Sequence, residues 1–365
     1  MLRILRIVAV CLLVSCSYVR ADRVDKFVEG IIEKRNIAGL SLAIIDHGQI
    51  VKKAAYGVID KETKAAVTTN TLFQAGSISK PVSALGVLHL VEEKKLSLDD
   101  DVNLKLKTWK VPENEFTKEE KVTLRRILSH NAGLTVHGFP GYNVLGQMPS
   151  LVQVLDGQKP ANTAAIRVDI PPGSKVRYSG GGFTVMQEIV IDVTGEPFAR
   201  YLRETVLAPV GMTSSTFEQP PPNSVSTNTA HGYYPNGEAV KGWWHVYPEM
   251  AAAGLWTTPS DLARYAITVQ QSFAGATNTV ISQKLTREML TPQKENVGLG
   301  LMLERSGKNL RFKHGGRDEG FDALLVAYTE QGFGVALMIN SNDNTGALER
   351  IVEFIGREYH WPEYP

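Results

Sequence analysis

The pattern of apolar and polar residues near the N-terminus predicts a helix followed by a β-hairpin. Over residues 24–34, apolar residues recur at the spacing of one helix face. Leu40 to Ile45 and Ile50 to Val58 are apolar runs separated by a short polar turn. Two such runs joined by a turn are typical of paired antiparallel strands. We therefore expect this end of the chain to contribute a hairpin to a sheet.

The middle of the chain has mainly helical patterns. A long helix is expected from about Ser77 to Lys95, and shorter ones at residues 123–129 and 183–193, between turns rich in Pro, Gly and Asn. Thr258 followed by Pro259 is a strong helix start, because Thr can cap the first turn and Pro suits the first helical position.

The last third of the chain returns to strand-like patterns. Residues 297–303, 321–328 and 333–339 read as three strands with short polar or Gly-bearing connections. A final helix is expected from Asn344 to about Tyr359. Strands from the two ends of the chain are expected to pair in one antiparallel sheet, with helices from both termini on its faces.

These patterns predict an α/β (α+β) fold in which a mainly helical lobe is inserted into a sheet lobe. We expect a single domain over residues 22–365. Its sheet lobe would comprise about residues 22–75 and 255–365, and its helical lobe about residues 76–254.

The first 21 residues have the features of an export signal. Arg3 and Arg6 precede an apolar run, Ile7 to Val14, that is far shorter than the ~20 residues needed to span a bilayer. Cleavage after Ala21 is one expectation. The alternative is a lipoprotein signal that ends before Cys16, whose lipid would anchor the protein to a membrane. In both cases we expect an exported protein, periplasmic or secreted.

Composition excludes several classes of function. Hydrophobic residues make up 43% and charged residues 21% of the chain, as in an ordinary globular protein. The 39 Lys and Arg against 38 Asp and Glu leave no strong field, so no nucleic-acid partner is expected. Both cysteines, Cys11 and Cys16, lie in the export segment. The mature chain would therefore have no disulfide, no Cys nucleophile and no Cys metal site.

The first candidate for chemistry is Ser77, which begins the only S-x-x-K pattern of the chain. At a helix start, residues three apart share a face, so the Lys80 amine can lie beside the Ser77 hydroxyl and take its proton. The helix N-terminus adds backbone N–H groups that favour developing negative charge. The pattern alone is weak, because an exposed Ser and Lys on an amphipathic helix have the same spacing.

The second candidate is Tyr178, which is followed by Ser179 and three glycines. Glycines let the backbone approach another surface closely, and a Tyr on such a turn can point its hydroxyl at a site. A core Tyr that anchors a loop is the alternative interpretation.

The third candidate is the segment His314, Gly315, Gly316 and Arg317, between two expected strands. The glycines would let a substrate lie along the strand as an added partner. The Arg317 backbone N–H could then complete an oxyanion hole with the N–H of Ser77. A β-bulge or hairpin bend is the alternative interpretation.

The order of these three patterns resembles the serine β-lactamase and penicillin-binding-protein superfamily. The resemblance is to its class C-like branch, which includes β-lactamases, D-Ala-D-Ala carboxypeptidases, D-amino-acid peptidases and family VIII esterases. Further matching segments are Leu96–Val102, Ile127–Leu134 (similar to LLSHTSGL), Pro172–Ser179 (similar to PG-x-x-[FWR]-x-YS) and Ala253–Leu262 (similar to GGLWSTPSDLA). The resemblance spans roughly residues 23–358.

The resemblance implies an acyl-enzyme mechanism for the cleavage of an amide, lactam or ester bond. Ser77 would be acylated, Lys80 and Tyr178 would share proton transfer, and His314 would replace the Lys of the usual K-T-G. The implied fold is an antiparallel sheet with helices and a helical lobe, with the site between them. The resemblance implies a small-molecule or peptide substrate and no metal or organic cofactor.

Two residues depart from the family pattern. Gly180 stands where the Y-x-N motif has Asn, whose amide contacts substrate in lactam and peptide enzymes. His314 would make the charge that faces a substrate carboxylate depend on pH, with Lys313 or Arg317 as candidates to compensate. Both changes favour a carboxylesterase or a D-amino-acid or DD-peptidase over an efficient β-lactamase. A non-enzymatic alternative is a penicillin-binding or sensor module.

Motifs of other enzyme classes are missing from the sequence. No Ser lies in a G-x-S-x-G pattern, and there is no H-E-x-x-H, Walker or G-x-G-x-x-G motif. His130 and His137 are expected to be structural or loop residues rather than metal ligands.

Overall fold

The computed structural model describes residues 23–364, except 224–226 and 307–308. The predicted cleavage after Ala21 and lipidation of Cys16 lie outside the described residues. Within the described part of the chain, no helix is long and apolar enough to cross a membrane.

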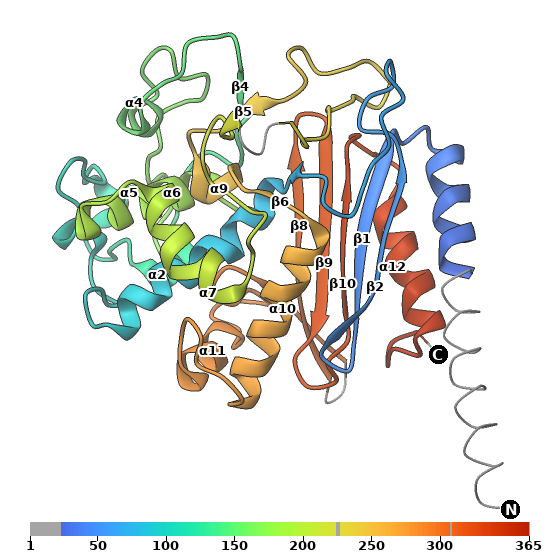
Figure 1. The fold of residues 1–365 in the computed structure, drawn as a ribbon. Coiled ribbons are helices and arrows are strands. Elements are labelled where there is room, and N and C mark those ends of the chain that lie inside the picture. Colours follow the sequence, from blue (N-terminus) through green and yellow to red (C-terminus); the bar gives the residue numbers. More distant parts are fainter. Residues whose placement is uncertain (1–22, 224–226, 307–308, 365) are drawn as a thin grey trace, which may run out of the picture.

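A six-stranded antiparallel sheet joins the two ends of the chain (Figure 1). Its strands, in spatial order, are β2 (Gln49–Gly57), β1 (Gly39–Asp46), β10 (Gly334–Ile339), β9 (Phe321–Tyr328), β8 (Asn309–Asp318) and β7 (Met302–Ser306). The N-terminal hairpin meets the C-terminal strands through β1 and β10, with Leu40 opposite Ile339. The predicted hairpin and the predicted pairing of the two chain ends are confirmed.

Helices from both termini cover one face of this sheet. The helix at residues 23–34 and α12 (Ala347–Glu358) lie side by side there, and Phe27 stacks on Phe354 at a ring distance of 4.0 Å (Figure 1). Their apolar sides share a buried cluster with inward-facing residues of β1 such as Leu42. On the opposite face lies α10 (Pro259–Ala274), which contacts β1 and β10. Apolar burial on both faces, at roughly 25 cal/mol per Å², holds the layers together.

The helical lobe is built around two buried helices, α2 (Ser79–Glu92) and α5 (Gly180–Thr194). The shorter helices of the fold are α3 (Leu124–Leu128), α4 (Leu151–Asp156), α6 (Phe198–Leu202), α7 (Ala208–Val210), α9 (Met250–Ala253) and α11 (Gln283–Met289). Single turns are η1 (Gly76–Ile78), η2 (Val102–Leu104), η3 (Glu115–Thr117) and the π-helical η4 (Arg203–Leu207). Two short strand pairs are β3 (Phe73–Gln74) with β6 (Trp256–Thr257), and β4 (Tyr142–Asn143) with β5 (His245–Val246).

Local sequence explains where the main helices begin. Thr258 caps α10 by accepting a hydrogen bond from the Asp261 N–H, and Pro259 is its first residue, as predicted. Ser179 caps α5 in the same way by accepting from the Gly182 N–H. This cap starts α5 at Gly180, earlier than the apolar pattern indicates, because the glycines carry no periodicity of their own.

The C-terminal strands differ from the prediction at two places. Residues 297–301 form a bridge at Val297 followed by bends, and β7 begins only at Met302. The apolar pattern does not include residues 309–318 among the three expected strands, although the His314–Arg317 motif was expected to lie along a strand; the whole segment is the long strand β8. Its glycines and charged residues have low strand propensity, but β7 and β9 pair with it on both sides, and this tertiary pairing decides the conformation.

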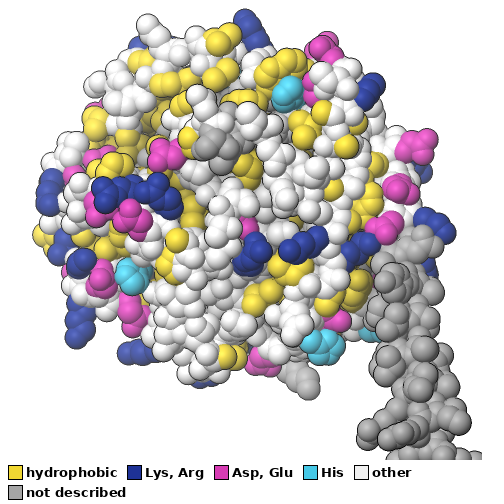
Figure 2. Space-filling view, in the orientation of Figure 1, with side chains coloured by type: hydrophobic (Ala, Val, Ile, Leu, Met, Phe, Trp, Pro, Cys, Tyr) yellow, Lys and Arg dark blue, Asp and Glu magenta, His cyan; other side chains and the backbone are white. Residues whose placement is uncertain are grey.

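Charged side chains of both signs are interspersed over the face shown in Figure 2. Several pair locally: Arg125, for example, bonds Asp99 at 2.6 Å and Glu288 at 2.5 Å. A surface of mixed sign produces little long-range field.

Candidate active site

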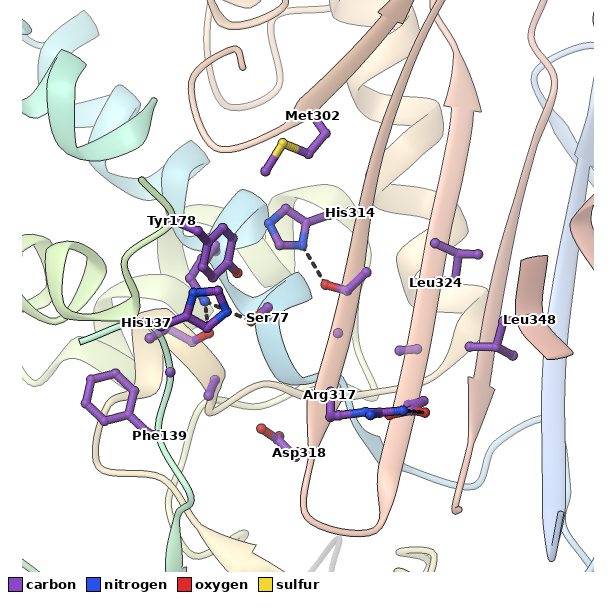
Figure 3. Close-up of a pocket in the computed structure, with 18 of the residues that line it drawn as sticks. Ser77, His137, Phe139, Tyr178, Met302, His314, Arg317, Asp318, Leu324 and Leu348 are labelled. Atoms are coloured by element: carbon purple, nitrogen blue, oxygen red, sulfur yellow. Dashed lines mark hydrogen bonds and ion pairs between the residues drawn. The ribbon is translucent and has the colours of Figure 1, made fainter. Parts of the chain in front are cut away.

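Ser77 lies in the turn η1, where the chain passes from β3 into helix α2. Gly76, directly before it, has a φ of 51°, a conformation that glycine adopts without strain. The Ser79 hydroxyl stabilises the turn, because it donates to the Gly76 carbonyl at 2.6 Å and accepts from the Leu255 N–H at 2.9 Å. Ser77 is therefore presented by a hydrogen-bonded turn at the edge of the helical lobe (Figure 3).

Lys80 is the closest polar partner that the structure gives to Ser77. Its Nζ donates to the Ser77 Oγ at 2.9 Å and to the Ala252 carbonyl at 2.8 Å. Lys80 is only 2% exposed, and none of the described carboxylates lies within ion-pair distance of it. The sequence-predicted pair is thus brought together, with the amine held by two uncharged oxygens.

Tyr178 projects toward the same place from the turn before α5 (Figure 3). The Lys80 Nζ lies 4.9 Å from the centre of its ring. His130 stacks on the ring at 4.2 Å, and its Nδ1 accepts a hydrogen bond from the Ser179 N–H at 3.2 Å. The Ser179 cap and His130 together hold Tyr178 in position.

His130 is a supporting residue whose role the sequence did not reveal. It was expected to be structural, and its stacking on Tyr178 shows which residue it supports. Burial, together with the charge of Lys80, keeps its pKa well below the ordinary value, so the ring is neutral. Its position in the SHNAGL segment was the only available signal.

His314 faces Lys80 from strand β8 and is fully buried. Burial and the neighbouring Lys80 lower its pKa to about 3. Its Nδ1 lies 2.6 Å from the Gly315 carbonyl, so the neutral ring donates there. The expectation of a pH-dependent charge on His314 is therefore wrong for the physiological range, because the low-dielectric site keeps the imidazole neutral.

Neither Lys313 nor Arg317 supplies a free positive charge in place of the one that the neutral His314 lacks. Lys313 pairs with Glu304 on the adjacent strand β7. The Arg317 guanidinium makes two hydrogen bonds of 2.7 Å to Asp322. The expectation that Lys313 or Arg317 would compensate is therefore not met in this arrangement of side chains.

Gly316 allows strand β8 to run directly beside η1. A Cβ at this position would lie 1.9 Å from the Ala75 carbonyl oxygen, whereas a Cβ on Gly315 would meet nothing closer than 3.9 Å. A Cβ on Gly76 would likewise lie 2.5 Å from the Arg317 nitrogen. The Arg317 backbone N–H is thus brought next to the residue that precedes Ser77.

Gly180 packs closely against the loop at residues 137–139. Its N–H donates to the His137 carbonyl at 2.9 Å. A Cβ on Gly180 would lie 3.0 Å from the Phe139 ring and 3.1 Å from that carbonyl. The loop therefore occupies the space that a side chain at position 180 would need.

An open cavity of about 530 Å³ connects these groups. Ser77, Lys80, Tyr178 and the segment His314–Arg317 line it, with Phe139 and Met302 on opposite sides (Figure 3). Among the described residues, no group of three or more His, Cys, Asp or Glu is arranged to hold a metal ion. The arrangement can perform nucleophilic catalysis: a hydroxyl beside an amine, in a cavity bordered by backbone N–H groups.

Comparison with known proteins gives a consistent result. The profile of the Beta-lactamase family matches residues 24–355. The protein flp of Staphylococcus aureus (strain N315) is 24% identical and a beta-lactamase of Pseudomonas fluorescens 30% identical; the alignments cover 92% and 66% of this chain. The chain spans 66% and 62% of the length of these two relatives.

Two solved structures have the same fold. The octameric penicillin-binding protein homologue from Pyrococcus abyssi has a TM-score of 0.73 at 24% identity, over 88% of this chain and 74% of that one. The D-amino acid amidase from Ochrobactrum anthropi SV3, complexed with L-phenylalanine amide, has a TM-score of 0.71 at 23% identity, over 93% and 98%. The predicted fold class is confirmed.

The contact between β8 and η1 predicts losses of stability of very different size for substitutions at two adjacent glycines. Gly316→Ala should destabilise the protein by about 3 kcal/mol or more, because its Cβ would meet a backbone oxygen that cannot move aside. Gly315→Ala, the matched control, should cost less than about 1 kcal/mol. Urea unfolding measures both; equal effects of the two substitutions would contradict the close contact.

The buried neutral His314 predicts a loss of stability in acid. The unfolded chain binds a proton at this His below about pH 6.5, while the folded protein does not until about pH 3. Stability from this group is therefore present above pH 6.5 and falls as the pH falls. From pH 7 to pH 5, wild type should lose about 2 kcal/mol more than His314→Gln. Urea unfolding at both pH values tests this, with exposed His360→Gln as control; equal losses in wild type and His314→Gln would rule it out.

Proposed function

This chain belongs to the beta-lactamase family of serine hydrolases, and on that basis we propose that it hydrolyses an ester or amide through an acyl-enzyme on Ser77. The observation that carries the proposal is the 2.9 Å hydrogen bond from the Lys80 Nζ to the Ser77 Oγ at the cavity surface. A Ser hydroxyl is a weak nucleophile until a base takes its proton, and Lys80 is the base within reach.

In the proposed mechanism, the Ser77 Oγ attacks the substrate carbonyl while the unprotonated Lys80 amine, with Tyr178, takes its proton. The backbone N–H groups of Ser77 and Arg317 would hold the oxyanion. Tyr178 or Lys80 then returns the proton to the leaving group. Water, activated by the same groups, attacks the acyl-enzyme and frees both the acid and Ser77.

The charges around the site favour substrates without a carboxylate next to the scissile bond. His314 is neutral, and the side chains of Lys313 and Arg317 are occupied by ion pairs. Gly180 also offers no side-chain amide to a lactam or peptide. These features support an esterase or amidase over a β-lactamase or DD-peptidase.

Three substitutions test the assigned roles. Ser77→Ala should abolish hydrolysis of p-nitrophenyl acetate, and Lys80→Ala and Tyr178→Phe should each lower kcat/KM at least about 100-fold, because each removes a proton-transfer group. Lys118→Ala and Tyr234→Phe, outside the cavity, are the matched controls. Near-wild-type turnover by a correctly folded Lys80→Ala or Tyr178→Phe variant would remove that residue from the mechanism. Absence of any Ser77-dependent hydrolysis would favour a binding or sensor module.

Substrate preference is tested by a direct comparison. Wild type should hydrolyse p-nitrophenyl acetate with a kcat/KM at least about tenfold above that for a chromogenic cephalosporin, because no free cation or Asn amide faces the cephalosporin. Ser77→Ala supplies the background rate for both. Equal or faster Ser77-dependent cephalosporin turnover would place the protein among β-lactamases instead.

A further inference from the structure

Asp318, the last residue of β8, is a buried acid that the mechanism above does not use. It lines the active-site cavity beyond Arg317 (Figure 3), yet it is only 4% exposed. No hydrogen bond of good geometry from the described residues reaches either of its carboxylate oxygens, and the Gly76 N–H is the nearby backbone donor. A buried, unpaired carboxyl group is costly and is normally compensated. Its presence in a cavity wall points to a partner that arrives with the substrate.

Burial raises the pKa of Asp318 well above the ordinary value, and the charge of Lys80 and the Gly76 N–H oppose this rise. A positively charged group placed beside Asp318 would therefore favour its ionised form. The two groups would then form a charge-assisted hydrogen bond.

The cations in the cavity wall are already engaged elsewhere. Lys80 donates to Ser77 and Ala252, and the Arg317 guanidinium is held by Asp322 and by the Asp343 carbonyl. Apart from these two cations, the histidines and Tyr178, the ionisable side chains of the wall are acids: Asp318, Asp322, Asp343 and Glu349, of which Asp322 is paired with Arg317. A negatively charged substrate group would be repelled here, and a positively charged one attracted.

The position of Asp318 indicates which half of the substrate it would meet. Tyr178 and His314 lie on one side of Ser77, and Asp318 lies on the other side, beyond Arg317 (Figure 3). Because Tyr178 and Lys80 return the proton to the leaving group, the leaving group lies on the Tyr178 side. The acyl half then extends past the Arg317 N–H toward Asp318.

We infer that Asp318 forms a subsite for a protonated amino group on the acyl half of the substrate. The preferred substrates would be esters or amides of amino acids with a free amino group. This inference rests on the proposed function and specifies its substrate class.

Matched ester pairs test the inference in the wild-type protein. Methanol release is measured from alanine methyl ester and N-acetylalanine methyl ester, each as D and L enantiomers, with p-nitrophenyl acetate as a neutral reference. The free amine should be preferred in kcat/KM by at least about tenfold for one enantiomer, the effect expected of a charge-assisted hydrogen bond. Equal or faster turnover of the acetylated esters, with the reference ester hydrolysed, would overturn the subsite alone. Failure on every ester would overturn the proposed function itself.

A substitution then assigns the preference to one side chain. Asp318→Asn should reduce the ratio of free-amine to N-acetyl turnover to near one, because the amide keeps the shape and removes the charge. Glu238→Gln, an exposed acid that does not line the cavity, should keep the wild-type ratio. A folded Asp318→Asn variant that retains the full preference would overturn the assignment. Because the ratio is measured within each variant, a general loss of activity does not affect it.

Discussion

The backbone of strand β8 packs directly against the backbone of the turn that carries Ser77. The remaining geometry of the site depends on this contact. A Cβ on Gly316 or on Gly76 would collide with the opposite backbone, at 1.9 Å and 2.5 Å respectively. With no side chain in between, a strand of the sheet lobe runs along the first turn of the helical lobe. Separating the two segments by the width of a methyl group would move Ser77 away from both His314 and the Arg317 N–H.

The second feature on which the site depends is the buried environment of Lys80, which contains no paired carboxylate among the described residues. The amine is held by the Ser77 hydroxyl and the Ala252 carbonyl rather than by a carboxylate. Burial and the same amine keep His314 and His130 neutral. Burial beside this amine therefore keeps both neighbouring imidazoles uncharged. The cost appears as lower stability in acid, since both imidazoles bind protons in the unfolded chain.

The departure at Gly180 is coupled to the loop at residues 137–139. Where the family motif has Asn, this chain has a glycine against which His137 and Phe139 pack. A side chain at this position would be tightly packed, and its neighbours in that loop would have to shift by a few tenths of an ångström. The change therefore alters the shape of the cavity beside Tyr178 as well as removing an amide, and both effects bear on the substrate.

Sequence patterns alone predicted much of this protein. The S-x-x-K spacing at a helix start placed Lys80 beside Ser77, because residues three apart share a helix face whatever surrounds them. The N-terminal hairpin and the caps at Thr258 and Pro259 also follow from local chemistry. The resemblance to a known superfamily, carried by several short segments, indicated the fold class.

Other features were decided only by the tertiary structure. Residues 309–318 form a strand because β7 and β9 pair with them, against the low strand propensity of Gly315 and Gly316. The protonation of His314 depends on burial beside Lys80, which no spacing encodes. The same holds for Asp318, which looked like one more polar residue after Arg317. Whether an acid is solvated or buried without a partner depends on segments distant in sequence, so only the folded chain could reveal it.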